Sequence, residues 1–153
     1  MLKKLFIPVL FLFLNSCGYE AIYSKKNFIK YDFSISELTF IGERRVNLKI
    51  KQNLHNYTVR ESSNRLIVEI TSSEEKKIMA KDVAGDPTKF KIFIDVSAKV
   101  KNGKIKNNFM FTESFTYNNN SNKMELTALE NNIINNLTGI ITEKLIFKLS
   151  TFQ

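Results

Sequence analysis

The sequence has a single cysteine, a single histidine and no apolar run long enough to cross a membrane as a helix. One cysteine, Cys17, excludes an internal disulfide, so packing must hold the fold together. The histidine, His55, has no cysteine, second histidine or carboxylate cluster at ligand spacing, so we expect no metal site and interpret it as structural. There is also no glycine-rich phosphate loop and no nucleophile elbow, so we do not expect an enzyme or a cofactor.

The only cysteine stands at a boundary near the amino terminus. Lys3 and Lys4 precede an apolar run, residues 5–14, and Asn15-Ser16-Cys17 comes directly after it. Ten residues at about 1.5 Å each reach only about half of a roughly 30 Å hydrocarbon core, which favours an export signal over a membrane span. The pattern resembles a bacterial lipobox, so we predict that residues 1–16 are cleaved and that Cys17 carries a covalent lipid. The alternative is an ordinary buried cysteine in an uncleaved leader.

The chain after the leader is long enough for one domain. The leader carries two of the 23 basic residues and none of the 15 acidic ones, so the remainder has a net charge of +6. A basic surface suggests nucleic acid, but an exported protein meets anionic lipid and lipopolysaccharide instead, so we expect no nucleic-acid partner. Residues 17–27 show little apolar pattern and are predicted to be a tether, and residues 28–153 to be a single domain.

The first half of the domain predicts a strand, a helix and a second strand. Apolar residues alternate with polar ones from residue 31 to 36 and change phase at Glu37, which indicates a bulge or the end of a strand. Four residues at steps of four, four and three then mark one stripe of an amphipathic helix: Val46, Ile50, Leu54 and Tyr57. Residues 65–72 alternate again, and this strand is expected to continue with a bend through Ile78. Gly85-Asp86-Pro87 predicts a turn.

A long hairpin is the clearest signal in the domain. Alternating runs flank Asn102 and Gly103, and Asn-Gly is a strong signal for a two-residue type I′ turn. If these two residues form the loop, four apolar pairs face each other: Val100 with Ile105, Val96 with Phe109, Ile94 with Phe111 and Phe90 with Phe115. Glu113 would then face Ile92, an exception that the pattern does not explain.

The chain ends in a predicted helix of about 25 residues. Asn122 is the expected N-cap, and the carboxylate of Glu125, three residues later, is expected to hydrogen-bond back to Asn122. The predicted apolar stripe is Leu126, Leu129, Ile133, Leu137, Ile140, Leu145 and Leu149. Together these elements predict an α+β fold: a two-layer sandwich of about four strands in a mixed sheet, with two helices packed on one face. If the first two strands pair, a right-handed crossover makes them parallel.

The order of the predicted strands and helices after Cys17 resembles that of the lipopolysaccharide-assembly lipoprotein LptE family. The resemblance rests on Cys17-Gly18-Tyr19, on the "FSISELTF" strand leading through Gly42 into "RRVNLKIKQNL", on the hairpin, and on "SFTYNNN" running into the last helix. It implies a plug inside an LptD-type outer-membrane β-barrel, assistance to barrel assembly, and delivery of lipopolysaccharide to the outer leaflet. It also implies lipid anchoring on the periplasmic side of the outer membrane.

Two groups of basic residues are candidates for binding lipopolysaccharide. Four lysines surround the hairpin turn, namely Lys99, Lys101, Lys104 and Lys106, and two arginines, Arg44 and Arg45, begin the first helix. Phosphates and acidic sugars would be attracted to such clusters, although turn lysines can also simply keep an edge soluble. Two other functions remain open: a free periplasm-facing module that binds a small or anionic glycan ligand, and a lipid-anchored hydrolase, which would need converging titratable groups.

Overall fold

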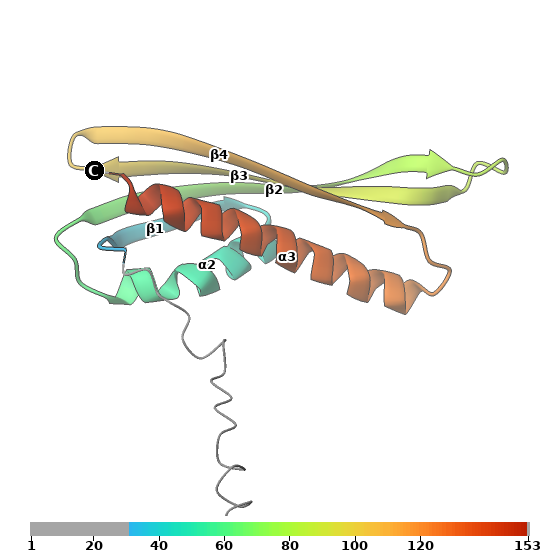
Figure 1. Ribbon diagram of the computed structural model, residues 1–153, viewed down its shortest axis with the longest axis horizontal. Helices are drawn as coiled ribbons and strands as arrows, with labels where there is room; N and C mark the ends of the chain where they lie inside the picture. Colours follow the sequence, from blue (N-terminus) through green and yellow to red (C-terminus); the bar gives the residue numbers. More distant parts are fainter. Residues whose placement is uncertain (1–30, 153) are drawn as a thin grey trace, which may run out of the picture. The chain divides into compact units, whose positions relative to one another are not determined.

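The computed structural model describes residues 31–152, and they form a four-stranded sheet covered on one face by two helices (Figure 1). The predicted signal peptide, Cys17 and tether lie outside the described residues. In chain order the elements are β1 (Ser34–Gly42), α2 (Arg44–Val59), β2 (Arg65–Lys81), β3 (Pro87–Asn102), β4 (Ile105–Asn118) and α3 (Lys123–Ser150). The predicted α+β sandwich is confirmed.

The sheet is mixed, and its spatial order follows the sequence, β1-β2-β3-β4. β1 pairs with β2 in parallel, as a crossover through α2 requires, whereas β2, β3 and β4 are antiparallel neighbours. The pairing of β1 with β2 shifts between Ile35 and Glu37, which confirms the predicted bulge. β2 runs on to Lys81, so the expected extension beyond Ser72 is also confirmed.

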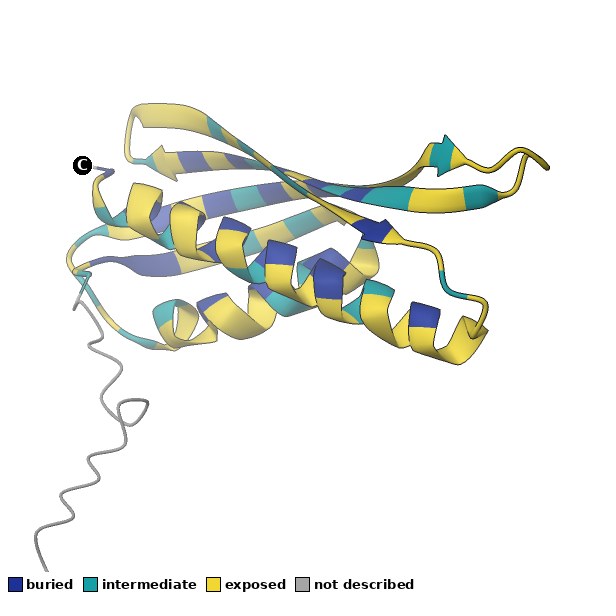
Figure 2. Cartoon of the chain, turned by 45° about the vertical axis from the view of Figure 1, so that its right-hand side comes forward, coloured by how far each residue is buried: buried dark blue, intermediate teal, exposed yellow. Residues whose placement is uncertain are grey.

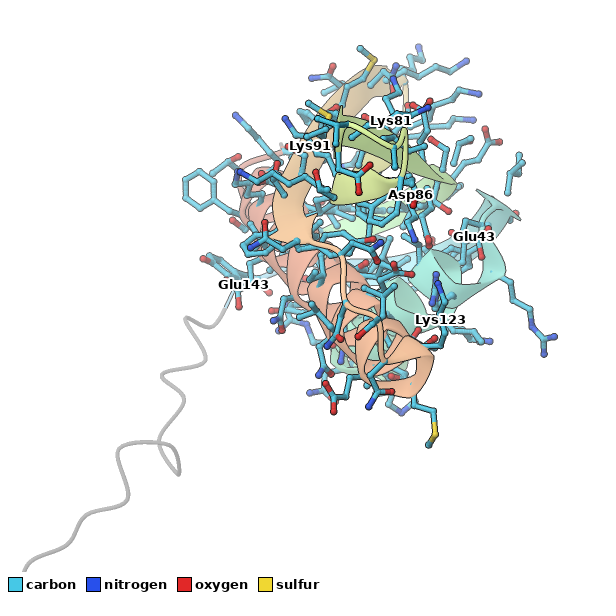
Figure 3. The ribbon with its side chains drawn as sticks, turned by 90° about the vertical axis from the view of Figure 1, so that its right-hand side faces the viewer. Glu43, Lys81, Asp86, Lys91, Lys123 and Glu143 are labelled. Atoms are coloured by element: carbon cyan, nitrogen blue, oxygen red, sulfur yellow. The ribbon has the colours of Figure 1, made fainter. Side chains whose placement is uncertain are left out.

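The core lies between the sheet and the helices. Apolar side chains alternate along the inner face of the sheet and are almost completely buried; on β2 and β3 they are Leu66, Val68, Ile70, Ile92, Ile94, Val96, Ala98 and Val100. α2 contributes Val46, Ile50 and Leu54, as predicted. In Figure 2 the buried residues of both helices face the sheet and the exposed ones face away. The end view in Figure 3 separates the same two layers, with Lys81 and Lys91 on the strands and Lys123 at the start of α3.

A glycine makes the sharp passage from β1 into α2 possible. Gly42 has a φ of +96°, and a Cβ built on it would lie 2.0 Å from the carbonyl oxygen of Ser72 on β2. That carbonyl accepts a hydrogen bond from the backbone N–H of Glu43 (3.1 Å), and the Ser72 hydroxyl lies 2.8 Å from Oδ1 of Asn47. The junction is therefore tied to β2 at a distance that only a residue without a side chain permits.

The hairpin register differs from the prediction by two residues. Asn102 is paired with Ile105, so the loop is Gly103 and Lys104 instead of Asn102 and Gly103. Among the described non-glycine residues none has a positive φ, and Gly103 has a φ of +56°; positive φ at the first loop residue alone is the pattern of a type II′ turn. The predicted apolar pairs were therefore wrong. The actual opposed pairs on the inner face include Ala98 with Phe109, Val96 with Phe111, Ile92 with Phe115 and Phe90 with Tyr117.

The correct register also explains Glu113. It lies opposite Ile94, not Ile92, on the face that α3 covers, and its carboxylate forms an ion pair with Lys144 of that helix. A charged residue on an inner face is tolerated here because it meets its partner at the margin of the core.

α3 is confirmed in its extent and its cap but not in all of its stripe. The Asn122 side chain accepts hydrogen bonds from the backbone N–H groups of Met124 and Glu125, while Glu125 accepts one from Nδ2 of Asn122. Two residues of the predicted stripe, Leu129 and Ile140, are 40% and 43% exposed. Four residues outside the predicted stripe are buried instead: Ile134, Thr138, Ile141 and Thr142. The prediction followed a single line of apolar residues, whereas the buried face of α3 is wide enough to include adjacent positions such as 133 and 134 or 137 and 138.

Candidate anion-binding surface

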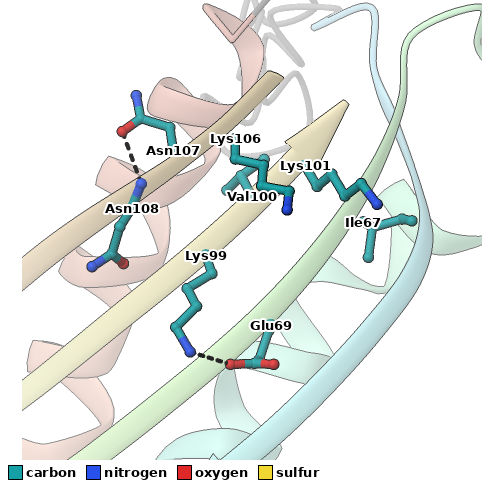
Figure 4. A pocket seen from close by; sticks show the side chains of 8 residues that line it. All are labelled: Ile67, Glu69, Lys99, Val100, Lys101, Lys106, Asn107 and Asn108. Carbon is teal, nitrogen blue, oxygen red and sulfur yellow. Dashed lines mark hydrogen bonds and ion pairs between the residues drawn. The ribbon is translucent and has the colours of Figure 1, made fainter. Parts of the chain in front are cut away.

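Three of the four predicted lysines line one hollow on the outer face of the sheet. Lys99 and Lys101 project from β3 and Lys106 from β4, since outward positions alternate with the buried ones and Lys101 is directly opposite Lys106. The open hollow has a volume of about 540 Å³, and its lining comprises Ile67, Glu69, Lys99, Val100, Lys101, Lys106, Asn107 and Asn108. Figure 4 shows the side chain of Lys106 extending from β4 across β3 towards the side of Lys101.

The charges in this hollow are only partly neutralised. Nζ of Lys99 lies 2.7 Å from a carboxylate oxygen of Glu69, the residue opposite it on β2. Lys101 and Lys106 have no acidic partner among residues 31–152. Three lysines against one glutamate leave an excess of positive charge beside an apolar floor that includes Ile67, which is 39% exposed. Such a surface attracts anions that also carry an apolar part.

Lys104 is not part of the hollow. It occupies the second position of the two-residue turn and is exposed there. The sequence places all four lysines within eight residues, but strand alternation and the turn separate this one from the others. Glu69, Ile67 and Asn108, which complete the hollow, were missed, although the outward phase of residue 69 in the alternating strand was a usable signal.

The two arginines lie on the helix layer, away from the lysine hollow. Arg45 donates to both carboxylate oxygens of Glu74, at 2.7 and 2.9 Å, and to Oδ1 of Asn131 at 2.5 Å. It joins α2 to β2 and α3 and so has a structural task. Arg44 borders a separate hollow of about 420 Å³ together with Lys49. The structure therefore does not bring the arginines and the lysines into one site.

A polar cluster that sequence reasoning missed lies where β2 and β4 meet α3. Glu130 of α3 accepts hydrogen bonds from Nζ of Lys76 (2.5 Å) and from the hydroxyl of Tyr117 (2.6 Å). The ammonium group of Lys76 also lies 4.2 Å from the centre of the Phe90 ring. The signal was present in the sequence, because residues 74 and 76 continue the inward phase of residues 66–72 but are charged.

Burial and charge shift the pKa values of this cluster in opposite directions. Burial of Tyr117, followed by its hydrogen bond to Glu130 and the charge of that carboxylate, raises the pKa of the phenol far above its usual value. Burial alone would raise the pKa of Glu130, but the hydrogen bonds from Lys76 and Tyr117 and the charge of Lys76 outweigh it and lower the pKa. At neutral pH the phenol is thus protonated and the carboxylate ionised, which are the states that the hydrogen bonds need.

The described part of the chain lacks two further features. Within residues 31–152 no helix combines the length and hydropathy needed to span a bilayer. The same residues include no group of three histidine, cysteine or acidic side chains arranged to hold a metal ion, and His55 is exposed on α2.

Comparisons with known proteins show a shared fold at low sequence identity. No protein-family model and no curated protein sequence matches the chain. Among solved structures, rare lipoprotein B from Shewanella oneidensis aligns with a TM-score of 0.54 at 12% identity, covering 73% of this chain and 95% of the other. Lipoprotein B from Nitrosomonas europaea gives 0.53 at 13% identity, covering 80% and 87%. A minor lipoprotein from Acinetobacter baumannii gives 0.50 at 12% identity, covering 78% and 95%.

Proposed function

We propose that this chain is an outer-membrane lipoprotein, anchored through acylated Cys17, that plugs an LptD-type β-barrel, helps it assemble and assists delivery of lipopolysaccharide. The observation that carries the proposal is a fold shared with several solved bacterial lipoproteins behind a lipobox-like sequence. Acylation would fix the protein to the membrane firmly, because each buried methylene contributes about 0.8 kcal/mol.

The surface of the domain supports a role inside a barrel. A barrel lumen is polar, so a plug needs a polar outer wall with its apolar residues turned inward. The outward residues of β2 and β3 are mainly polar or charged and include Glu69, Thr71, Ser73, Asp95, Ser97 and Lys99. The sheet face opposite the helices thus has the polarity that such a wall requires.

The lysine hollow is our candidate contact for lipopolysaccharide. Its unpaired ammonium groups suit phosphates or acidic sugars, and its apolar floor suits part of a lipid or sugar ring. We expect the double variant Lys101→Glu with Lys106→Glu to weaken binding of lipopolysaccharide micelles, and added salt to weaken wild-type binding. The double variant Lys51→Glu with Lys123→Glu makes the same change in net charge at two exposed lysines of the helix layer and is the matched control. Equal binding by all three chains would remove the hollow from the proposal.

The partner is tested separately. Extraction in mild detergent followed by affinity purification is expected to recover a large β-barrel protein with the lipoprotein, and mass spectrometry is expected to find a cleaved, acylated Cys17. Depletion of the protein should lower the amount of lipopolysaccharide at the cell surface. Recovery of the lipoprotein alone, together with unchanged surface lipopolysaccharide, would refute the barrel-plug function.

The hollow also favours a second candidate, a free lipid-anchored module that binds a soluble anionic glycan. A volume of about 540 Å³ is within the usual range for small-ligand sites. This candidate predicts saturable binding of a short phosphorylated glycan by the lipoprotein without any barrel protein, whereas the plug predicts that the barrel is the stable partner.

A further inference from the structure

β4 has one edge that pairs with no strand of residues 31–152. It is the last strand in the order β1-β2-β3-β4, and it borders the sheet in Figure 1. Its pairing with β3 runs without a register shift, and the N–H of Asn119 continues it by donating to the carbonyl oxygen of Thr88 at 2.8 Å. Hydrogen-bonded and non-bonded positions alternate along an antiparallel pair. The odd-numbered residues of β4 therefore bond to β3, and the even-numbered ones turn their backbone groups away from it.

The free part of this edge extends from residue 110 to residue 116. At Asn108 the outward N–H is already engaged, since the side chain of Asn107 accepts a hydrogen bond from it at 2.8 Å. Beyond this point the outward groups, which bond to no other backbone group of the described chain, belong to Met110, Thr112, Ser114 and Thr116. The stretch contains no proline, bulge or lysine of the kind that protects an edge. It is therefore competent to pair with another strand.

An apolar groove lies beside the free edge, between β4 and α3. A hollow of about 550 Å³ is lined by residues of both elements, among them Met110, Phe111 and Phe147. Met110 is 78% exposed, Phe147 54%, and Phe115, further along β4, 50%. Lys144 in the lining is already paired with a β4 carboxylate. The edge offers main-chain hydrogen bonds and the hollow offers room for alternate side chains, which are the two requirements for binding a peptide as an added strand.

These two features identify the occupant as a polypeptide. A row of alternating N–H and C=O groups is matched by the backbone of another strand, whereas a lipid chain or a sugar offers no such repeat. An uncovered groove would also leave Phe115 and Phe147 facing the polar lumen of a barrel. The paired strands of a closed barrel have no free edge, so a segment of the barrel protein that covers the groove must lie outside those strands.

We propose that an extended segment of the barrel protein binds along β4 as a fifth strand and pairs with the outward backbone groups of residues 110–116. This inference rests on the proposed function, because it takes the barrel as the partner. Opposed residues on adjacent strands point to the same face, so side chains opposite Phe111 and Phe115 enter the groove against α3. Those between them lie on the polar outer face, beside Thr112 and Ser114. The segment is therefore expected to alternate apolar and polar residues.

Amide hydrogen exchange tests the pairing residue by residue. In the full-length lipoprotein alone in mild detergent, the outward N–H groups of Thr112, Ser114 and Thr116 should exchange fast and the inward one of Phe111 slowly. In the complex recovered with the barrel protein, the outward amides should exchange at least about tenfold more slowly, while the inward one changes little. Outward amides that stay fast in a complex containing the barrel would overturn this inference alone. Recovery of the lipoprotein without any barrel protein would overturn the proposed function and this inference with it.

Two pairs of variants test the same contact by its lifetime. Ser114→Pro removes one outward N–H on the side where an edge strand tolerates proline, and Ser114→Ala keeps that N–H. The barrel protein should dissociate from immobilised lipoprotein about fivefold to tenfold faster with Ser114→Pro than with Ser114→Ala. Phe147→Glu leaves the strand intact but places a charge in the groove, and it should also speed dissociation. Leu48→Glu, the same kind of change at a 48% exposed residue of α2, should not.

Circular dichroism establishes that each of these variants is folded. Equal dissociation rates within both pairs of variants would refute the added strand, even where the barrel protein is recovered with the wild-type chain.

Discussion

Replacement of Gly42 by alanine should destabilise the domain more than any other single methyl group added to a described glycine. The residue has a φ of +96°, and the new Cβ would lie 2.0 Å from the Ser72 carbonyl oxygen and 3.0 Å from its carbon. A side chain at positive φ costs roughly 1–2 kcal/mol. Moving a packed backbone to make room adds about 1–3 kcal/mol more, so we expect a total loss of about 2–5 kcal/mol.

A second glycine separates these two contributions. Gly85 has a similar φ, +91°, but a Cβ built there has nothing within 4 Å. Gly85→Ala should therefore lose only the conformational part, about 1–2 kcal/mol. The difference between the two variants measures the close approach of the junction between β1 and α2 to β2.

Urea unfolding followed by far-ultraviolet circular dichroism is the suitable assay, since the sequence has no tryptophan to report by fluorescence. A loss of this size is a substantial part of the 5–15 kcal/mol that usually stabilises a domain, so Gly42→Ala should shift the midpoint clearly. Equal losses in the free energy of unfolding for Gly42→Ala and Gly85→Ala would refute the argument, because they would show that the Ser72 backbone can move away from the new methyl group without loss of stability.

Three other changes have expected outcomes. Gly139→Ala in the middle of α3 should raise the free energy of unfolding by about 0.5–1 kcal/mol, because the helix gains propensity and the methyl group meets nothing within 4 Å; a lower urea midpoint would contradict this. Asn122→Ala should cost about 1 kcal/mol by removing the acceptor for two N–H groups at the start of α3; an unchanged thermal midpoint would contradict it. The folded-state pKa of Glu130 is lowered, so its contribution is present above the unfolded pKa near 4.5 and disappears as pH falls through the folded value. Glu130→Gln should therefore lower stability at pH 7 and flatten the acid side of the stability curve, and parallel curves for both proteins would refute this.

The sequence was sufficient for the elements and the layers because their signals are local. Period-two alternation located the strands and recurring apolar positions located α2, and each kind of element has one way to bury its apolar face. The N-cap of α3 was identifiable for the same reason, since Asn122 and Glu125 are three residues apart.

The pairing register of β3 and β4 could not be predicted from such local signals. Shifting β4 by two residues moves each side chain to a new partner but leaves it on the same face, so apolar alternation fits both registers equally well. The choice depended on the turn, where Gly103 and Lys104 form the loop in place of Asn102 and Gly103. The ion pair of Glu113 with Lys144, which joins residues far apart in the sequence, was hidden for a related reason.

Because a two-residue shift leaves each side chain on the same face of the sheet, the predicted lysine site was largely correct although the register was wrong. Membership of the outer face depends only on parity, so Lys99, Lys101 and Lys106 share a face in either alignment. Alternation along a strand does not show which residue of the adjacent strand lies opposite. Glu69, which neutralises Lys99, lies on β2, and its position opposite Lys99 depends on the pairing of two residues that are far apart in the sequence. The unneutralised charge therefore belongs to Lys101 and Lys106, and a binding experiment that alters Lys99 alone would test an ion pair of the sheet instead of the anion site.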